Sequence, residues 1–156
     1  MSSIKTALKS EAVRPKLQVK ENAPVPSMES EARTLLSEDA FVSMLYLERR
    51  RAERAQKRFV LVLVDVKRAL DDGNKNRTLA KIGIALTNST RETDILGWYL
   101  EDNLIGVIGT ELGETAPKII HERLLEKLRA AFQHSVGKDK SSKISVSFHF
   151  FPEEYG

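Results

Sequence analysis

The sequence predicts a single α+β domain that contains a four-stranded antiparallel sheet, with helices on one face and an extra helix at the N-terminal side. Three observations indicate this class: an unbroken apolar run from Phe59 to Val64, an apolar strand–turn–strand pattern over 95–108, and helical periodicity around both. The 156 residues, of which 41% are hydrophobic and 30% are charged, suit one compact core.

The composition excludes several functional classes. The chain has no cysteine, so it can form neither a disulfide framework nor a thiolate metal site, and its three histidines lack a zinc-binding spacing. No apolar run approaches the roughly 20 residues of a membrane-spanning helix, and the first five residues lead into no apolar export signal. We therefore expect a cytoplasmic protein with no membrane span.

Residues 1–34 differ in composition from the rest of the chain. Basic residues and three prolines, Pro15, Pro24 and Pro26, are mixed there with Ser and Glu. The segment has too few bulky apolar side chains to offset the entropy lost on folding. We predict a disordered basic tail over 1–34 and a folded domain over 35–156.

A second basic cluster lies late in the first predicted helix and just after it. It consists of Arg49, Arg50, Arg51, Arg54, Lys57 and Arg58. Cations near a helix C-terminus face the negative end of the helix dipole. Aromatic residues that could stack on single-stranded nucleic acid do not alternate with these cations. Despite a net charge of +3, we expect a solvated helix face here and no nucleic-acid site.

The predicted elements begin at residue 35. Ser37 is the expected N-cap of the first helix, because its hydroxyl can accept from the free amides of the first turn. Apolar positions recur at three-to-four spacing from Phe41 to Ala55, which predicts one buried helix face. The run 59–64 has no polar alternation and ends at Asp65, so we predict a central strand that is covered on both faces.

A polar stretch over 71–76 separates this strand from a second helix, whose apolar pattern ends near Asn88. Ile95–Tyr99 and Leu104–Ile108 are predicted to form an antiparallel hairpin, with Leu100 to Asn103 as its turn.

Thr115 and Pro117 mark the start of a third helix, because proline is favoured in the first helical turn. This helix is predicted to end in a loop around 135–140. Apolar and polar side chains alternate from Ile144 to Phe150, which is typical of a strand with one wet face. We predict that this last strand lies at a sheet edge.

The resulting order, βαββαβ behind an extra helix, is the palm or ferredoxin-like arrangement, in which right-handed crossovers place both helices on one face. The apolar strands 59–64 and 104–108 should be neighbours at the sheet centre. Asp65 would then lie beside the turn that carries Asp102. Two acids on adjacent central strands can hold magnesium between triphosphate oxygens, as in the palms of nucleotidyl cyclases and polymerases.

These residues resemble a known family, the GGDEF domains that make cyclic di-GMP. The stretch Phe59–Val66 resembles the family's first strand with its metal-binding Asp, and Thr93–Leu104 lies over its Arg-Tyr-Gly-Gly-Asp-Glu-Phe hairpin. Ile144–Phe148 resembles the family's strand after its second helix. The resemblance covers roughly residues 36–151 and rests on element order and hydrophobic spacing.

The departures from the family pattern fall on the signature turn. Leu100 and Glu101 stand where the family has two glycines, and their side chains occupy the space through which a nucleotide approaches the turn backbone. Asp102 is retained, and Asn103 replaces the next acidic residue before Leu104. We therefore interpret these five residues as a degenerate signature turn.

Other contacts that the resemblance implies are also missing. Lys67 replaces the second acid of the family's Asp-x-Asp motif, and 67–72 holds no match to its guanine-contacting Asn and Asp. The family's C-terminal helix with its phosphate-binding Lys has no counterpart either. Asp65 and Asp102 remain as a formal metal-ligand pair, which we interpret as two solvated acids at strand ends. We expect no catalysis, no metal and no cofactor.

One family feature is retained in register. GGDEF domains often carry an Arg-x-x-Asp motif a few residues before the signature, where cyclic di-GMP binds and inhibits, and Arg91 to Asp94 falls at the matching distance. A guanidinium can bond a phosphate and a guanine edge together, and a carboxylate can accept from guanine N–H groups. The alternative is a local turn in which Arg91 and Asp94 form an exposed ion pair worth about 0–1 kcal/mol.

Three functions remain open. The first is a catalytically inactive GGDEF-like sensor or docking domain, with cyclic di-GMP as its candidate ligand, in a bacterial signalling or exopolysaccharide system as the resemblance implies. The second is a protein-interaction domain without a nucleotide ligand, whose Arg-rich helix and basic tail bind an acidic protein partner. The third, which we place last, is a residual metal-dependent nucleotide cyclase.

Overall fold

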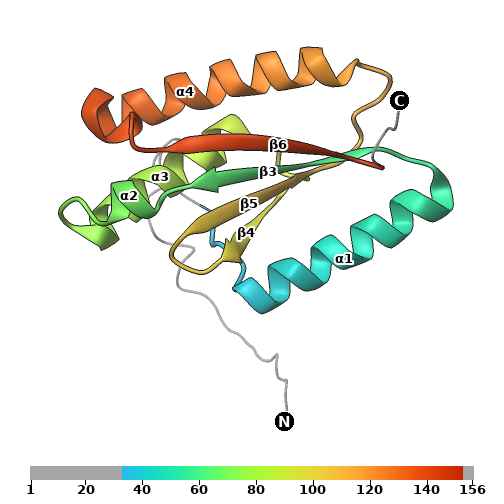
Figure 1. Cartoon of the computed structure of the whole chain (residues 1–156), viewed down its shortest axis with the longest axis horizontal. Coiled ribbons are helices and arrows are strands. Elements are labelled where there is room, and N and C mark those ends of the chain that lie inside the picture. Colours follow the sequence, from blue (N-terminus) through green and yellow to red (C-terminus); the bar gives the residue numbers. More distant parts are fainter. Residues whose placement is uncertain (1–32, 153–156) are drawn as a thin grey trace, which may run out of the picture. The chain divides into compact units, whose positions relative to one another are not determined.

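The computed structural model describes residues 33–152, so the predicted tail lies outside the described residues over 1–32 (Figure 1). The described elements, in chain order, are α1 (Glu38–Ala55), β3 (Phe59–Asp65), α2 (Lys67–Leu70), α3 (Lys75–Ser89), β4 (Ile95–Leu100), β5 (Leu104–Gly109), α4 (Pro117–Ser141) and β6 (Ser145–Phe151).

The strands form one antiparallel sheet in the order β4-β5-β3-β6 (Figure 1). Val62 in β3 lies opposite Val107 of β5 on one side and Phe148 of β6 on the other. The predicted α+β class, the four-stranded antiparallel sheet and the central position of the two apolar strands are confirmed. Along β6 exposed and half-buried side chains alternate, and β6 lies at the sheet edge as predicted.

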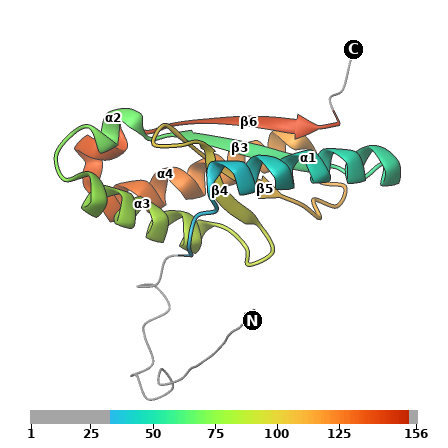
Figure 2. The same cartoon turned by 90° about the horizontal axis from the view of Figure 1, so that it is seen from below.

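Helices α3 and α4 cover one face of the sheet (Figures 1 and 2). Their buried side chains Ile82, Leu86, Leu128 and Phe132 belong to one hydrophobic cluster with Val62 of β3, and each of the five is at most 2% exposed. Full burial of such a side chain stabilises the fold by about 1.5–3 kcal/mol. This face therefore holds the larger core.

Helix α1 lies on the other face (Figure 2). Its buried residues Phe41 and Leu45 form a second cluster with Leu61 of β3 and Ile108 of β5. Ser37 caps the helix as predicted, because its hydroxyl accepts from the Ala40 N–H at 3.2 Å. The extra helix thus closes the side of the sheet that α3 and α4 leave open.

Two glycines on the hairpin make room for α1. Gly97 and Gly106 lie opposite each other in β4 and β5. A Cβ atom at Gly106 would lie 2.4 Å from the ring of Phe41, and one at Gly97 would lie 2.7 Å from it. The fully buried Phe41 ring therefore packs directly on backbone. A side chain at either glycine would push α1 away from the sheet.

The folded domain begins before residue 35, which is where the sequence pattern predicted its start. The Arg33 N–H donates to Thr87 Oγ1 at 2.9 Å, and Leu36 forms a parallel bridge with Gly97 of β4. Arg33 has the basic, polar character of the preceding segment, but it joins the domain through hydrogen bonds. A prediction based on apolar periodicity does not detect such an attachment.

Two further differences concern helices. The short α2 follows β3 directly and was not predicted. The loop predicted at 135–140 is a kink instead: Gly137, with a φ of +90° that glycine adopts without strain, divides α4 into two helical segments. Within residues 33–152, no helix is both long enough and apolar enough to cross a membrane.

Candidate functional site

The turn between β4 and β5 is the first candidate region, because the sequence predicts a degenerate signature there. The Asn103 N–H donates to the Leu100 carbonyl at 2.9 Å, and Asp102 adopts a φ of +65°. Leu100 is 47% exposed, Glu101 is exposed, and Leu104 is half-buried where β5 begins. The side chains of Leu100 and Glu101 therefore flank a turn that a glycine pair would leave bare.

The end of β3 lies next to this turn, as the sequence predicted. Asp65 is opposite Leu104 in the register of β3 and β5, and the Val66 N–H donates to the Asn103 carbonyl at 2.9 Å. The strand end and the turn are thus joined by backbone hydrogen bonds.

Each carboxylate of the formal metal pair has a partner within the chain. Asp102 Oδ1 lies 3.1 Å from Lys75 Nζ at the start of α3, and Asp65 Oδ1 accepts from the Lys67 N–H at 3.2 Å. Lys75 and Asp102 are about half exposed, so their attraction is screened by water. Among residues 33–152, no three His, Asp or Glu side chains gather in an arrangement that could hold a metal ion.

The second candidate region is the loop between α3 and β4, where the structure brings Arg91 and Asp94 together. The Arg91 N–H donates to Asp94 Oδ2 at 2.8 Å, and the Asp94 N–H donates to the Arg91 carbonyl at 3.0 Å. The Arg91 guanidinium lies 3.8 Å from Asp94 Oδ1 and donates to the Thr110 carbonyl. A local turn is therefore present, as the alternative interpretation of the motif expected, but Asp94 is largely enclosed.

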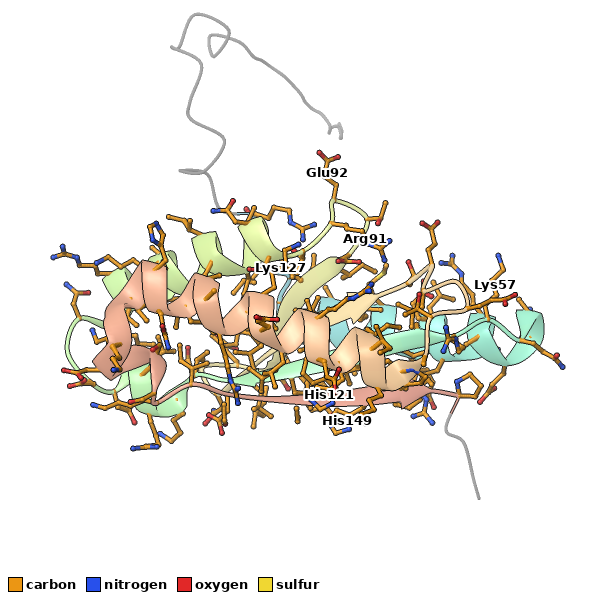
Figure 3. The ribbon with its side chains drawn as sticks, turned by 90° about the horizontal axis from the view of Figure 1, so that it is seen from above. Lys57, Arg91, Glu92, His121, Lys127 and His149 are labelled. Carbon is orange, nitrogen blue, oxygen red and sulfur yellow. The ribbon has the colours of Figure 1, made fainter. Side chains whose placement is uncertain are left out.

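A cavity of about 420 Å³, which we call the loop cavity, opens beside this turn. Arg91 from the loop and Arg123 and Lys127 from α4 line it, together with the acids Asp94 and Glu111. Figure 3 shows Arg91 and Lys127 on the same side of the molecule. Apolar walls come from Val60, Leu112, Ile120 and Leu124. The cavity thus combines an excess of cations with apolar surface, as small-ligand sites do.

Asp94 is the most informative residue of the loop cavity. Its side chain is only 10% exposed, and within the described part of the chain its Oδ1 is buried without a hydrogen-bond partner. A buried acceptor that lacks a donor costs about 1–3 kcal/mol. The Arg91 guanidinium, 3.8 Å from Oδ1, is the cation paired with this carboxylate.

Sequence reasoning missed the contribution of α4 to this cavity. Arg123 and Lys127 are exposed residues four positions apart on one helix, and such a pair normally indicates a solvated face. Lys75 was missed in the same way. The only sequence signal was the excess of basic residues, which does not say which of them face a cavity.

A third region, which we call the arginine groove, is a cavity of about 870 Å³ between the end of α1 and the loop after β5. Its cationic lining consists of Arg51, Arg54, Lys57 and Arg58. Arg51 pairs with Glu48 at 3.1 Å, and the Arg58 guanidinium donates to the carbonyls of Gly113 and Thr115 at 2.6 and 2.7 Å. Glu111 and Leu112 line both the groove and the loop cavity.

Solved GGDEF domains share this fold. A DGC protein from Thermotoga maritima is 21% identical with a TM-score of 0.55, over 78% of this chain and 86% of its own. The GGDEF domain of YfiN (TpbB) from Pseudomonas aeruginosa is 16% identical with a TM-score of 0.58, over 81% of this chain and 75% of its own. No family model matches the chain, and neither does any curated protein.

Two further similar structures were solved as complexes. The GGDEF domain of DgcB from Caulobacter crescentus, in complex with c-di-GMP, is 15% identical with a TM-score of 0.56, over 82% of this chain and 79% of its own. The diguanylate cyclase SiaD from Pseudomonas aeruginosa, in complex with its activator SiaC, is 16% identical with a TM-score of 0.52. The match covers 84% of this chain and 50% of the SiaD chain. At these identities the likeness shows the fold, which is the GGDEF palm.

Proposed function

We propose that this domain is a catalytically inactive GGDEF-like regulatory domain that binds cyclic di-GMP in the loop cavity. The observation that carries the proposal is the pairing of Arg91 with the largely enclosed Asp94 carboxylate beside a cavity that three cations line. Such a site suits a ligand that offers N–H donors and negative charge together.

Cyclic di-GMP has both properties. Each guanine presents a ring N–H and an amino group on one edge, and a carboxylate such as that of Asp94 can accept from them. Its two phosphodiesters are anionic, and Arg91, Arg123 and Lys127 supply three cations at the cavity wall. A volume of about 420 Å³ lies within the usual range of small-molecule sites.

The signature turn supports the inactive part of the proposal. Leu100 and Glu101 place side chains where a nucleotide would approach the turn. Lys75 pairs with Asp102, so an ammonium group already lies beside one of the two carboxylates that would have to hold the metal ion. Magnesium would have to displace this lysine to bind Asp102 in the usual oxygen shell.

Likeness in fold gives further support. The DgcB domain was solved with c-di-GMP, and this chain shares its architecture while differing in most of its residues. The Arg91–Asp94 loop lies between α3 and β4, at the opposite end of β4 from the signature turn. A ligand held there would not depend on Asp65 or Asp102.

Calorimetric titration of the full-length protein tests the proposal. Cyclic di-GMP should bind, and GTP with magnesium should not. A linear dinucleotide, pGpG, is the matched control for the cyclic ligand. Absence of binding by a protein with an intact circular dichroism spectrum would remove the ligand assignment.

The arginine groove favours a second candidate function, a protein-interaction domain for an acidic partner. Its volume of about 870 Å³ is twice that of the loop cavity, and Arg54 and Lys57 line it. SiaD, which shares the fold, was solved with a protein activator. An acidic segment would complement the groove by charge.

A further inference from the structure

Arg33, the first residue that the structure describes, is bound to the loop that carries Arg91 and Asp94. Its Nη1 donates to the Glu92 carbonyl at 3.2 Å and to the Asp94 carbonyl at 2.8 Å. Its Nη2 donates to Thr90 Oγ1 at 2.8 Å. One side chain from outside the loop thus holds three of its residues.

The backbone around Arg33 fixes where this guanidinium lies. The Arg33 N–H donates to Thr87 Oγ1 in α3. Leu36 then joins β4, because its N–H donates to the Leu96 carbonyl at 3.1 Å and its carbonyl accepts from the Trp98 N–H at 2.9 Å. The segment 33–36 is therefore anchored to α3 and β4 on either side of the loop.

The Arg33 contacts also hold the backbone of Asp94. The Asp94 carbonyl accepts from Arg33, and the Asp94 N–H donates to the Arg91 carbonyl. The Asp94 carboxylate is held within the same turn, because Oδ2 accepts from the Arg91 N–H and the Arg91 guanidinium lies 3.8 Å from Oδ1. Both Arg91 and Asp94 line the loop cavity. Exposed loops otherwise belong to the least stable parts of a domain.

We propose that Arg33 is a positioning residue for the loop cavity: it holds Arg91 and Asp94 in one arrangement and couples the segment 33–36 to ligand binding. The ligand in this proposal is that of the proposed function, cyclic di-GMP. Arg33 itself does not line the cavity. Because coupling is reciprocal, a ligand that orders the loop also strengthens the docking of 33–36.

Arginine suits this role better than any other residue. Its planar fork donates to several oxygens at once, whereas a lysine ammonium is a point donor on a flexible stem. Arg33→Lys should therefore restore part of the effect of Arg33→Ala. Both variants keep the backbone N–H of residue 33, which donates to Thr87 Oγ1.

Hydrogen exchange of the full-length protein without ligand gives the first test. Arg33→Ala should raise the exchange rates of the Arg91 and Asp94 amides by about tenfold, and Arg33→Lys should raise them less. The exchange rates of the Leu61 and Val62 amides in β3 should not change. Unchanged rates there would show that the fold is intact. Unchanged rates at Arg91 and Asp94 in Arg33→Ala would overturn the proposal.

Calorimetry with cyclic di-GMP gives the second test. Arg33→Ala should weaken binding by roughly tenfold, with Arg33→Lys in between. Arg68→Ala is the matched control, because Arg68 is an exposed residue of α2 and does not line the loop cavity. Equal affinities for Arg33→Ala and Arg68→Ala would contradict a positioning role. If the unmodified protein binds no cyclic di-GMP while Arg33→Ala still loosens the loop, the ligand assignment fails and the hold of Arg33 on the loop is supported.

Discussion

Lys75 Nζ lies 3.1 Å from Asp102 Oδ1, so the carboxylate of the signature turn is paired with a lysine at the start of α3. A magnesium site between Asp65 and Asp102 would require this pair to break. The same turn carries the exposed side chains of Leu100 and Glu101 where the resemblance implies two glycines. We therefore expect both charge and shape at the turn to oppose catalysis.

We predict that the purified protein makes no cyclic di-GMP from GTP and magnesium. Replacing Leu100 and Glu101 by glycine and Asn103 by Glu should not create the activity, because Lys67 stands where the resemblance implies a second acid and 67–72 holds no match to the family's guanine contacts. Chromatography of the nucleotides after prolonged incubation is the measurement. Product that forms with the unmodified protein and disappears in Asp65→Ala would refute this prediction.

The contact between Phe41 and Gly106 makes a prediction about stability. Gly106→Ala places a methyl group 2.4 Å from the Phe41 ring, and overpacking of this kind costs about 1–3 kcal/mol. Urea unfolding should show this loss. Combining Gly106→Ala with Phe41→Leu should cost less than the sum of the two single changes, because the smaller side chain leaves room for the methyl group. Strict additivity would show that the two residues are not in contact.

Asp72 and Lys143 make a prediction about pH. Lys143 Nζ donates to Asp72 Oδ2 at 2.6 Å, and this bond together with the lysine charge holds the pKa of Asp72 below its usual value. A carboxyl group whose pKa is lower in the folded state stabilises the fold above its unfolded pKa, and this contribution is lost as pH falls through the folded pKa.

The stability of the unmodified protein should therefore fall with pH below about pH 4 more steeply than that of Asp72→Asn. Asp71→Asn removes the same charge and leaves the Asp72–Lys143 pair in place, which makes it the control. Urea unfolding across this pH range is the measurement, and added salt should reduce the difference because the pair is partly exposed. Identical slopes for Asp72→Asn and the unmodified protein would contradict the assignment.

The arginine groove makes a prediction that separates the two candidate functions. A poly-glutamate peptide should bind the full-length protein weakly and lose affinity as salt rises. Arg54→Glu should weaken this binding more than Arg50→Glu, because Arg54 lines the groove and Arg50 does not. Neither substitution should change the affinity for cyclic di-GMP. Equal losses in the two variants would indicate a diffuse charge effect instead of a groove.

The sheet could be predicted from the sequence because its signals are local. The unbroken apolar run of β3 indicated a central strand, and the alternation along β6 indicated an edge strand. The central position of β3 and β5 then placed Asp65 beside the signature turn, which the register confirms. Each of these inferences uses only the spacing of residues within one element and the order of elements.

The candidate site could be predicted only in part, because its contacts join distant segments. Arg91 and Asp94 lie three positions apart and form a recognisable motif. Arg33 and Thr90, by contrast, are 57 positions apart, and Arg123 and Lys127 reach the loop cavity from another helix. No local pattern distinguishes these basic residues from solvated ones, so the structure was needed to identify them.

The most direct test of the ligand assignment compares two substitutions by calorimetry with cyclic di-GMP. Loss of a charged contact to a ligand costs a few kcal/mol, or roughly 100-fold in affinity. Arg91→Ala should therefore abolish micromolar binding, while Asp65→Ala, at the far end of the sheet from the loop, should bind as the unmodified protein does. Equal losses in Arg91→Ala and Asp65→Ala, or no loss in Arg91→Ala, would place the ligand outside the loop cavity and contradict the account.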